Sequence, residues 1–223
     1  MTWKTRYRSF YYQDAPEPED PVLLPAETAL LCIDVQNYAL APKDTPAKQS
    51  RWQPFFDRMH GTVLPRLRAL QASFRHRGMD VIHARIACHL EDGRDRSLVQ
   101  KMPGWNNLLM PQDIPASQIV PEVAPVGDEI TVVKTTDSAV TGTNLRLLLH
   151  NMGIRTVVVT GLYTDQCVSS TVRSLADESF RVILVEDCCA AGTASLHEQA
   201  LTIMNMIYCN VLTSAELEPL MSG

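Results

Sequence analysis

The 223-residue chain lacks the features that mark several broad classes of protein. It has no apolar run near the roughly 18 residues that a membrane-spanning helix needs. Its 20 Lys and Arg residues are not clustered, and 25 Asp and Glu residues give a formal net charge of −5. We also find no internal repeat and no low-complexity tract. These absences lead us to expect neither a membrane nor a nucleic acid as a partner.

The chain also lacks a recognisable secretory signal and a C-x-x-C pair. Residues 1–13 mix basic and aromatic side chains without an apolar core run, so we expect a cytoplasmic location. Without an export signal, the six cysteines predict free thiols rather than a disulfide framework, and a thiol-redox role is disfavoured. The cysteines stand at positions 32, 88, 167, 188, 189 and 209.

What is present is an ordinary globular composition, with 45% hydrophobic and 20% charged residues. A chain of this length can bury the core of one α/β domain. Residues 1–28 are rich in Pro, Glu and Asp, which favours an extended N-terminal arm. We therefore expect an arm over 1–28 and a single domain over 29–223.

Apolar runs alternate with segments of helical periodicity along the domain. The predicted strands cover 30–35, 80–87, 130–134, 156–160, 181–185 and, more weakly, 210–213. The predicted helices cover 55–77, ending at Gly78, then 143–152, 165–179, 195–207 and 214–221. This alternation predicts a doubly wound, mainly parallel sheet of about six strands in a three-layer α/β/α, Rossmann-like fold.

Residues 88–128 show no strong periodicity and contain five prolines. A loop of this length in a compact domain is commonly functional, and we interpret it as a candidate lid. Trp105 within it is a candidate for the wall of a binding pocket or for a contact between subunits.

Three predicted strands end near a reactive side chain, namely Asp34, Lys134 and Cys167. Because the carboxyl ends of parallel strands share one edge of a sheet, these residues are expected to converge on one cleft. An acid, a cation and a thiol in one place form a candidate nucleophilic site. Each residue also has a structural interpretation: Cys167 as a small packing residue, Asp34 as a turn cap and Lys134 as a solvated strand end. These three interpretations are independent of one another, whereas a single cleft explains all three residues.

The neighbourhood of Cys167 predicts an activated thiol. Thr164 is expected to cap a helix, which would place Cys167 in the first turn. Unpaired N–H groups and the helix dipole favour an anion there, and with a nearby lysine they would lower the pKa of the thiol. The same N–H groups could hold the oxyanion of a tetrahedral intermediate.

From Thr28 to the C-terminus the chain resembles the isochorismatase-like cysteine hydrolases. The matching segments are C-I-D-V-Q-N (32–37), V-K-T-T-D-S-A-V-T-G-T-N-L (133–145), T-G-L-Y-T-D-Q-C-V-S-S-T-V-R (160–173), V-E-D-C-C-A-A (185–191) and N-V-L-T-S-A-E-L (210–217). The resemblance implies that Asp34 is the general base, that Lys134 holds the thiolate and that Cys167 attacks a carbonyl. It also implies a cis peptide at Leu162–Tyr163, with the N–H groups of Tyr163 and Cys167 forming the oxyanion hole.

Within that family, the motifs are most similar to those of the biuret and ureido-amide hydrolases. The resemblance implies hydrolysis of a C–N bond in a small ureido or carboxamide substrate, through a thioester that water cleaves, with release of ammonia or an amine. Two positions differ from the biuret hydrolases: Ala39 replaces a phenylalanine, and Ile207 stands near the place of a substrate-binding glutamine. The pocket is therefore expected to be larger or less polar, which puts biuret itself in doubt. Gln36 and Tyr38 are candidates to line this pocket or to satisfy the turn after Asp34.

No metal or other cofactor is expected. Nicotinamidases of the family hold a metal on a D-x-H pair and a later histidine, but here Asp57 and His60 have the wrong spacing. His83 and His89 have no carboxylate at ligand spacing, so they are interpreted as strand-end or loop histidines.

Two other functions stay open at this stage. A vinyl-ether hydrolase of the isochorismate type would need no thiol nucleophile, and a non-catalytic scaffold could keep the fold alone. The resemblance further implies a homodimer or homotetramer, in which the arm of residues 1–28 could pack across subunits.

Overall fold

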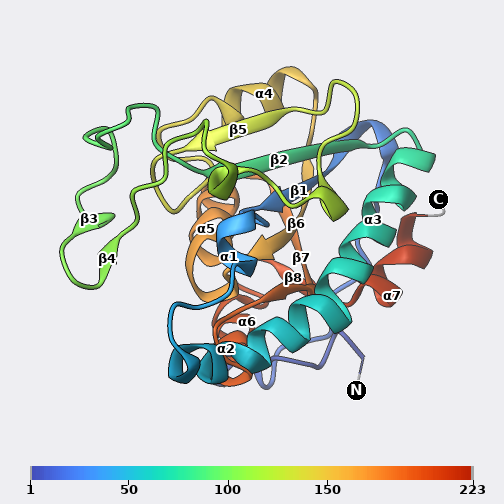
Figure 1. Cartoon of the computed structure of the whole chain (residues 1–223). Helices are drawn as coiled ribbons and strands as arrows, with labels where there is room; N and C mark the ends of the chain where they lie inside the picture. The colour runs from blue at the N-terminus through green and yellow to red at the C-terminus, as the bar shows by residue number, and fades with distance from the viewer. Residues whose placement is uncertain (1, 222–223) are drawn as a thin grey trace.

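Two strands in which every residue is buried, β1 (Thr28–Ile33) and β6 (Thr156–Leu162), lie at the centre of a six-stranded sheet (Figure 1). The computed structural model describes residues 2–221. The strand order is β5-β2-β1-β6-β7-β8, and all neighbours pair in parallel. Continuous apolar strands of this kind are expected where helices cover both faces of a sheet.

The remaining elements alternate with the central strands along the chain. The other strands of the sheet are β2 (Asp80–Ile86), β5 (Thr131–Lys134), β7 (Arg181–Ala190) and β8 (Asn210–Leu212). The α-helices are α1 (Asn37–Leu40), α2 (Pro46–Arg58), α3 (Leu64–His76), α4 (Leu145–Asn151), α5 (Ser169–Asp177), α6 (Ala194–Met204) and α7 (Ser214–Leu217). Within residues 2–221, no helix has both the length and the apolar character needed to cross a membrane.

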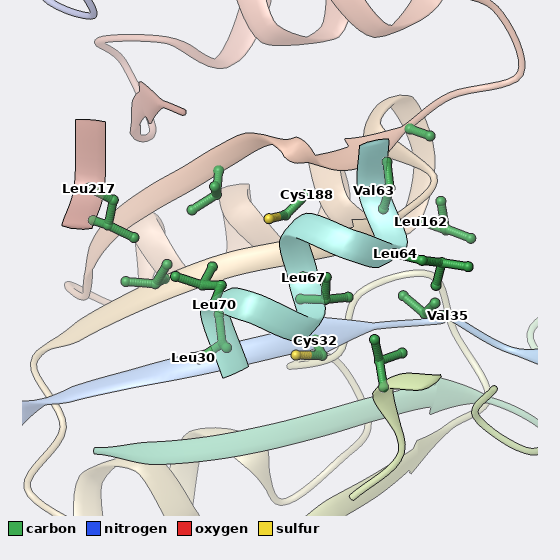
Figure 2. Packing of buried hydrophobic residues seen from close by; sticks show 14 of the residues in the cluster. Leu30, Cys32, Val35, Val63, Leu64, Leu67, Leu70, Leu162, Cys188 and Leu217 are labelled. Carbon is green, nitrogen blue, oxygen red and sulfur yellow. The ribbon is translucent and has the colours of Figure 1, made fainter. Parts of the chain in front are cut away.

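The helices form one layer on each face of the sheet. Alternate residues of β1 point to opposite faces, so Leu30 and Cys32 belong to one core and Leu31 and Ile33 to the other. The first core packs against α2, α3 and α7, and Figure 2 shows side chains of α3 above β1. The second core packs against α4, α5 and α6. The three-layer, doubly wound fold predicted from the sequence is thereby confirmed.

The predicted helix 55–77 proved to be the second part of a longer rod. Helix α2 begins at Pro46 after Thr45, whose side chain accepts a hydrogen bond from the Lys48 N–H, and a π-helical turn over Met59–Val63 joins it to α3. The rod ends where predicted, because Gly78 adopts a φ of 65° that side-chain-bearing residues avoid. The start was missed because the first two turns are mostly exposed and polar, so they carry no apolar periodicity.

Residues 88–128, expected to be a loop, contain a small two-stranded ribbon. Strands β3 (Lys101–Met102) and β4 (Asn106–Asn107) are antiparallel, and Figure 1 shows them extending away from the body of the molecule. The Arg96 guanidinium donates to Gln100 O (3.0 Å) and to Asn107 Oδ1 (3.1 Å). The base of the ribbon is thus tied together by one side chain, whereas movement of the segment as a lid stays a prediction.

The N-terminal arm packs against its own chain. Trp3 and Leu23 are buried in the core that contains α3. Arg6 forms an ion pair with Glu216, and the Asn205 side-chain amide donates to the carbonyl of Arg6 at 3.0 Å. These contacts give the arm an intramolecular role, while packing across subunits remains a prediction.

Candidate active site

Asp34 follows directly after β1 in an uncommon backbone conformation. Its φ is 53°, a left-handed value that aspartate tolerates better than β-branched residues do. The Asp34 N–H still bonds to Ala84 O of β2 at 2.9 Å, and Gln36 N–H bonds to Asp34 O at 2.9 Å. The chain therefore turns sharply at this residue while its backbone stays attached to the sheet.

Lys134 is the last residue of β5, and its side chain is completely buried. Its Nζ lies 2.8 Å from Asp34 Oδ2 and donates to Thr136 O at 3.1 Å. The interpretation of Lys134 as a solvated strand end is therefore wrong. A buried ammonium is tolerated only when it is paired and hydrogen-bonded, and both conditions hold here.

Cys167 lies in a single π-helical turn, Thr164–Val168, that joins β6 to α5. The peptide bond Leu162–Tyr163 before this turn is cis. Thr164 does not cap the turn as predicted, because its hydroxyl pairs with His197 Nδ1 at 2.8 Å. The side chain of His197 on α6 therefore anchors the first residue of the turn through this hydrogen bond.

Asp34, Lys134 and Cys167 interact with one another. Asp34 and Cys167 line one pocket, Lys134 is paired with Asp34 at 2.8 Å, and the charges of both act on the thiol. Burial raises the pKa of the Cys167 thiol, the charge of Asp34 raises it further, and Lys134 opposes the shift. This corrects the expectation of a lowered thiol pKa, since desolvation and the carboxylate outweigh the lysine.

The other two members of the cluster are also perturbed. Burial raises the pKa of Asp34 above its usual range, although the Lys134 ammonium acts in the opposite direction. Burial by itself would lower the pKa of Lys134, but the charges of Asp34 and Cys167 outweigh it and raise that pKa. These directions favour an ammonium on Lys134 and a protonated thiol on Cys167, with Asp34 paired to the ammonium at 2.8 Å.

A pocket of about 640 Å³ opens above the thiol. Asp34 and Cys167 lie at its inner end, and most of the residues expected to bind substrate line it, namely Gln36, Tyr38, Ala39, Trp105 and Tyr163. Tyr38 and Trp105 are 45% and 76% exposed, so both belong to the rim. Trp105 reaches the rim from the ribbon of β3 and β4.

Gln36 borders the pocket, but its amide is already occupied. Its Nε2 donates to Ile86 O (2.9 Å) and to Ser117 O (2.7 Å), and its Oε1 accepts from the Ile86 N–H (3.0 Å). The side chain thus joins the ends of β1 and β2 to the 3₁₀ turn Pro115–Ser117. Of the two roles predicted for Gln36, the geometry favours the one in which it satisfies backbone groups.

Ile207 does not line the pocket above the thiol. It is half exposed and borders two other depressions, together with Tyr208. Position 207 follows the end of α6, which the sheet order places beyond β7 and away from β1 and β5. In this single chain Ile207 therefore has no contact with the space where a substrate would meet Cys167.

Sequence reasoning missed several polar residues that line the pocket, among them Gln100, Asp137 and Arg173. The Asp137 carboxylate lies 3.9 Å from the thiol, measured from Oδ1 to Sγ. Asp137 could have been found from the sequence, because it stands three residues after Lys134 in one of the quoted motifs. Gln100 carried no such signal, since it lies in the segment without periodicity and reaches the site only through the tertiary fold.

The described residues contain no group of three or more His, Cys, Asp or Glu side chains that could hold a metal ion. The buried His83 is paired with Glu129, from Nε2 to Oε2, at 3.2 Å, and Arg75 bonds the same carboxylate. All six cysteines are free and buried. A metal-independent site stays a prediction for experiment.

Comparison with known proteins shows which family shares these features. The family model described as the isochorismatase domain matches residues 28–216, which covers the whole sheet and all seven α-helices except the last residue of α7.

Among curated relatives, the chain is 28% identical over 204 residues to the ureidoacrylate amidohydrolase RutB of Methylobacterium radiotolerans, which covers 82% of this chain and 75% of the relative. It is 30% identical over 147 residues to the maleamate amidohydrolase of Pseudomonas putida, with 65% and 67% covered. Among solved structures, an isochorismatase family protein from Desulfovibrio vulgaris superposes with a TM-score of 0.72 at 25% identity, covering 88% of this chain and 98% of that protein.

Proposed function

Since the chain belongs to the isochorismatase domain family of hydrolases, we propose that it is a cysteine-dependent amidohydrolase with Cys167 as its nucleophile. Its substrate would be a small ureido compound or carboxamide, and ammonia or an amine would be released. One observation carries the proposal: the buried Cys167 thiol and Asp34 carboxyl line one pocket, and the buried Lys134 ammonium is paired with that carboxyl at 2.8 Å. Two relatives named as amidohydrolases support this chemistry.

The first half-reaction begins with transfer of the thiol proton of Cys167 to the Asp34 carboxylate. Burial makes Asp34 a stronger base than an exposed aspartate, and Lys134 stabilises the thiolate as it forms. The sulfur then bonds to the carbonyl carbon, and the N–H groups of Tyr163 and Cys167 are proposed to hold the oxyanion. The C–N bond breaks as Asp34 returns its proton to the departing nitrogen, which leaves a thioester on Cys167.

In the second half-reaction, water cleaves the thioester. Asp34, again a carboxylate, accepts a proton from water while the oxygen attacks the carbonyl carbon. The C–S bond then breaks, and the thiolate recovers its proton from Asp34. One water is consumed, one carboxylic or carbamic acid and one ammonia or amine are formed, and the cluster returns to its starting charge state.

A panel of small amides tests the proposal through ammonia release. The panel contains biuret, triuret, ureidoacrylate, N-carbamoyl amino acids, maleamate and nicotinamide. We expect turnover of at least one member, complete loss of turnover in Cys167→Ala, and a loss of about 10³-fold or more in Asp34→Asn, since the base would be gone. Circular dichroism should show that both variants fold.

Three results separate this proposal from other functions. Ammonia release that persists in Cys167→Ala would remove the nucleophile assignment. Formation of pyruvate from isochorismate that is unaffected by the same substitution would indicate a vinyl-ether hydrolase. Loss of activity on dialysis against EDTA, with recovery on adding a divalent metal, would contradict a metal-independent mechanism.

A further inference from the structure

A second carboxylate contacts the thiol, and the reaction described above gives it no role. Asp137 lies in the loop between β5 and α4, and its Oδ1 is 3.9 Å from Cys167 Sγ. It also lines the pocket. Asp34 and Asp137 therefore both line the pocket that contains the sulfur, and of these two carboxylates only Asp34 is paired with Lys134.

Asp137 is held in place by the segment that leads into β3. The buried Gln100 donates from Nε2 to Asp137 Oδ1 at 3.0 Å. Gln100 is itself anchored, because its N–H bonds to Ser97 O (3.1 Å) and the Ser97 N–H bonds to Thr135 O (3.1 Å). The position of one carboxylate oxygen is thereby determined, and Oδ2 accepts no hydrogen bond from the residues that the structure describes.

The pocket offers more hydrogen-bond acceptors than cations. Three carboxylates line it, those of Asp34, Asp137 and Asp165, and the buried Asp165 Oδ1 has no hydrogen-bond partner within residues 2–221. Among the described lining residues the single cation is Arg173, whose guanidinium stacks over the ring of Tyr208 at 4.4 Å. A ligand that fills this pocket must bring N–H donors, because an acceptor that loses water without gaining a donor is destabilising.

We propose that Asp137 is a specificity-determining residue, which accepts a hydrogen bond from an N–H group on the acyl side of the scissile carbonyl. The carbonyl carbon bonded to sulfur has two other substituents besides oxygen. In the proposed reaction Asp34 serves the departing nitrogen, which leaves Asp137, whose Oδ1 is 3.9 Å from the sulfur, to accept from the substituent that stays. In a ureido compound this second substituent is also a nitrogen with a hydrogen, whereas in a simple carboxamide it is a carbon.

This inference rests on the proposed function and narrows it to ureido substrates. The acyl group left on Cys167 is then a carbamoyl group, R–NH–CO–S, after one ammonia has departed. Water converts it to the carbamic acid R–NH–COOH and restores the thiol, and the carbamic acid decomposes to R–NH₂ and CO₂. Atoms and charges balance without any further reactant.

Two pairs of substrates test the inference, since each pair differs only by exchange of N–H for CH₂. The uncharged pair is biuret and malonamide, and the charged pair is N-carbamoylglycine and succinamate. For at least one pair we expect the wild-type kcat/KM to favour the ureido member by about 10- to 100-fold, because a site built for an N–H rejects the analogue that lacks it. In Asp137→Ala the ureido member should lose that advantage, so that the ratio of the two kcat/KM values within the pair falls towards one. Asp128→Asn, an exposed carboxylate outside the pocket, is the control for a change of charge.

Binding to the inactive Cys167→Ala protein provides a second readout that needs no turnover. Calorimetry should show tighter binding of the ureido member of at least one pair, and the double variant Cys167→Ala/Asp137→Ala should bind both members equally. Equal kcat/KM and equal or absent binding within both pairs would overturn the role of Asp137. If Cys167→Ala still releases ammonia, the proposed function itself fails, so the two failures are distinguishable.

Discussion

At the scale of single residues, the site consists of ionisable side chains that are buried and affect one another's pKa values. Lys134 is completely buried, so its ammonium requires the Asp34 carboxylate 2.8 Å away, and each stabilises the charged form of the other. Both charges act on the thiol of Cys167, and burial raises its pKa. A thiol of this kind acts as a nucleophile only when a base accepts its proton as substrate arrives, which is the role proposed for Asp34.

The raised thiol pKa predicts slow alkylation of Cys167 at neutral pH. Iodoacetamide reacts with the thiolate, so labelling at pH 7 should be slower than that of an ordinary thiol, whose pKa is about 8.5, and should increase as the pH rises beyond that value. In Asp34→Asn one cause of the raised pKa is absent, so the labelling profile should move to lower pH. Mass spectrometry of peptides identifies the labelled cysteine. Fast labelling at pH 7 in the wild type would contradict the charge state described above.

At the scale of elements, close contact between β1 and β6 positions the site. Gly161 near the end of β6 has a φ of 115°, and a Cβ there would lie 2.0 Å from the carbonyl oxygen of Ile33. Ile33 directly precedes Asp34, and the cis peptide and the turn with Cys167 follow Gly161. The absence of a side chain at position 161 therefore lets the segments carrying the base and the nucleophile approach each other.

Substitution of Gly161 should be unusually damaging. Gly161→Ala adds a backbone clash to an unfavourable φ, so we expect a loss of about 3 kcal/mol or more in the free energy of unfolding. Gly153→Ala is the matched control, because it shares a positive φ (74°) but has open space around the added methyl group. That control should cost about 1–2 kcal/mol. Urea denaturation measures both, and equal losses would show that the contact with Ile33 is unimportant.

At the scale of the whole molecule, the N-terminal arm completes the core of one face. Trp3 is 7% exposed and belongs to the cluster of residues that includes Phe74 of α3 and Leu217 of α7. Ion pairs and hydrogen bonds near Arg6 connect the arm to the C-terminal elements. The first residues of the chain thus stabilise a layer formed much later in the sequence.

Removing the buried aromatic ring of the arm tests this role. Trp3→Ala should lower the free energy of unfolding by about 3 kcal/mol, because a large buried side chain would be replaced by a cavity. Phe10→Ala in the same arm is the control, since Phe10 is 82% exposed and its loss should cost less than about 0.5 kcal/mol. Urea denaturation followed by circular dichroism compares the two. A loss below about 0.5 kcal/mol for Trp3→Ala would indicate an arm that does not pack on the core in solution.

The resemblance to the family predicts that the protein forms a dimer or tetramer. The arm presents Phe10 and Tyr11 to solvent, and Trp105 is exposed on the ribbon of β3 and β4. Size-exclusion chromatography with light scattering distinguishes a monomer from the expected dimer or tetramer. A monomer at micromolar concentration would remove the prediction of subunit packing.

A site residue could be predicted only where the residues next to it in the sequence indicate its position in the fold. Asp34 and Lys134 end apolar runs, so their positions at one edge of a parallel sheet followed from the pattern itself. The hydrogen bond from Gln100 to Asp137 joins a segment without periodicity to a loop 37 residues later in the chain, and no local pattern announces such a contact. Ile207, which was assigned by resemblance, borders other depressions of this chain, and its role in substrate binding stays a prediction.

The order of apolar runs and helical segments, together with the residues at three strand ends, was sufficient to determine the layered parallel fold and the place where a thiol, an acid and a cation meet. The periodicity of apolar side chains can be recognised within a single segment of the sequence. Once the strands are known to be parallel, their carboxyl ends must share one edge of the sheet. Only the tertiary structure revealed the raised pKa of Cys167, the second carboxylate beside it and the burial of the arm. Each of these depends on which groups lose water together and which charges then face one another across the fold, and that is a property of packing rather than of any local run of residues.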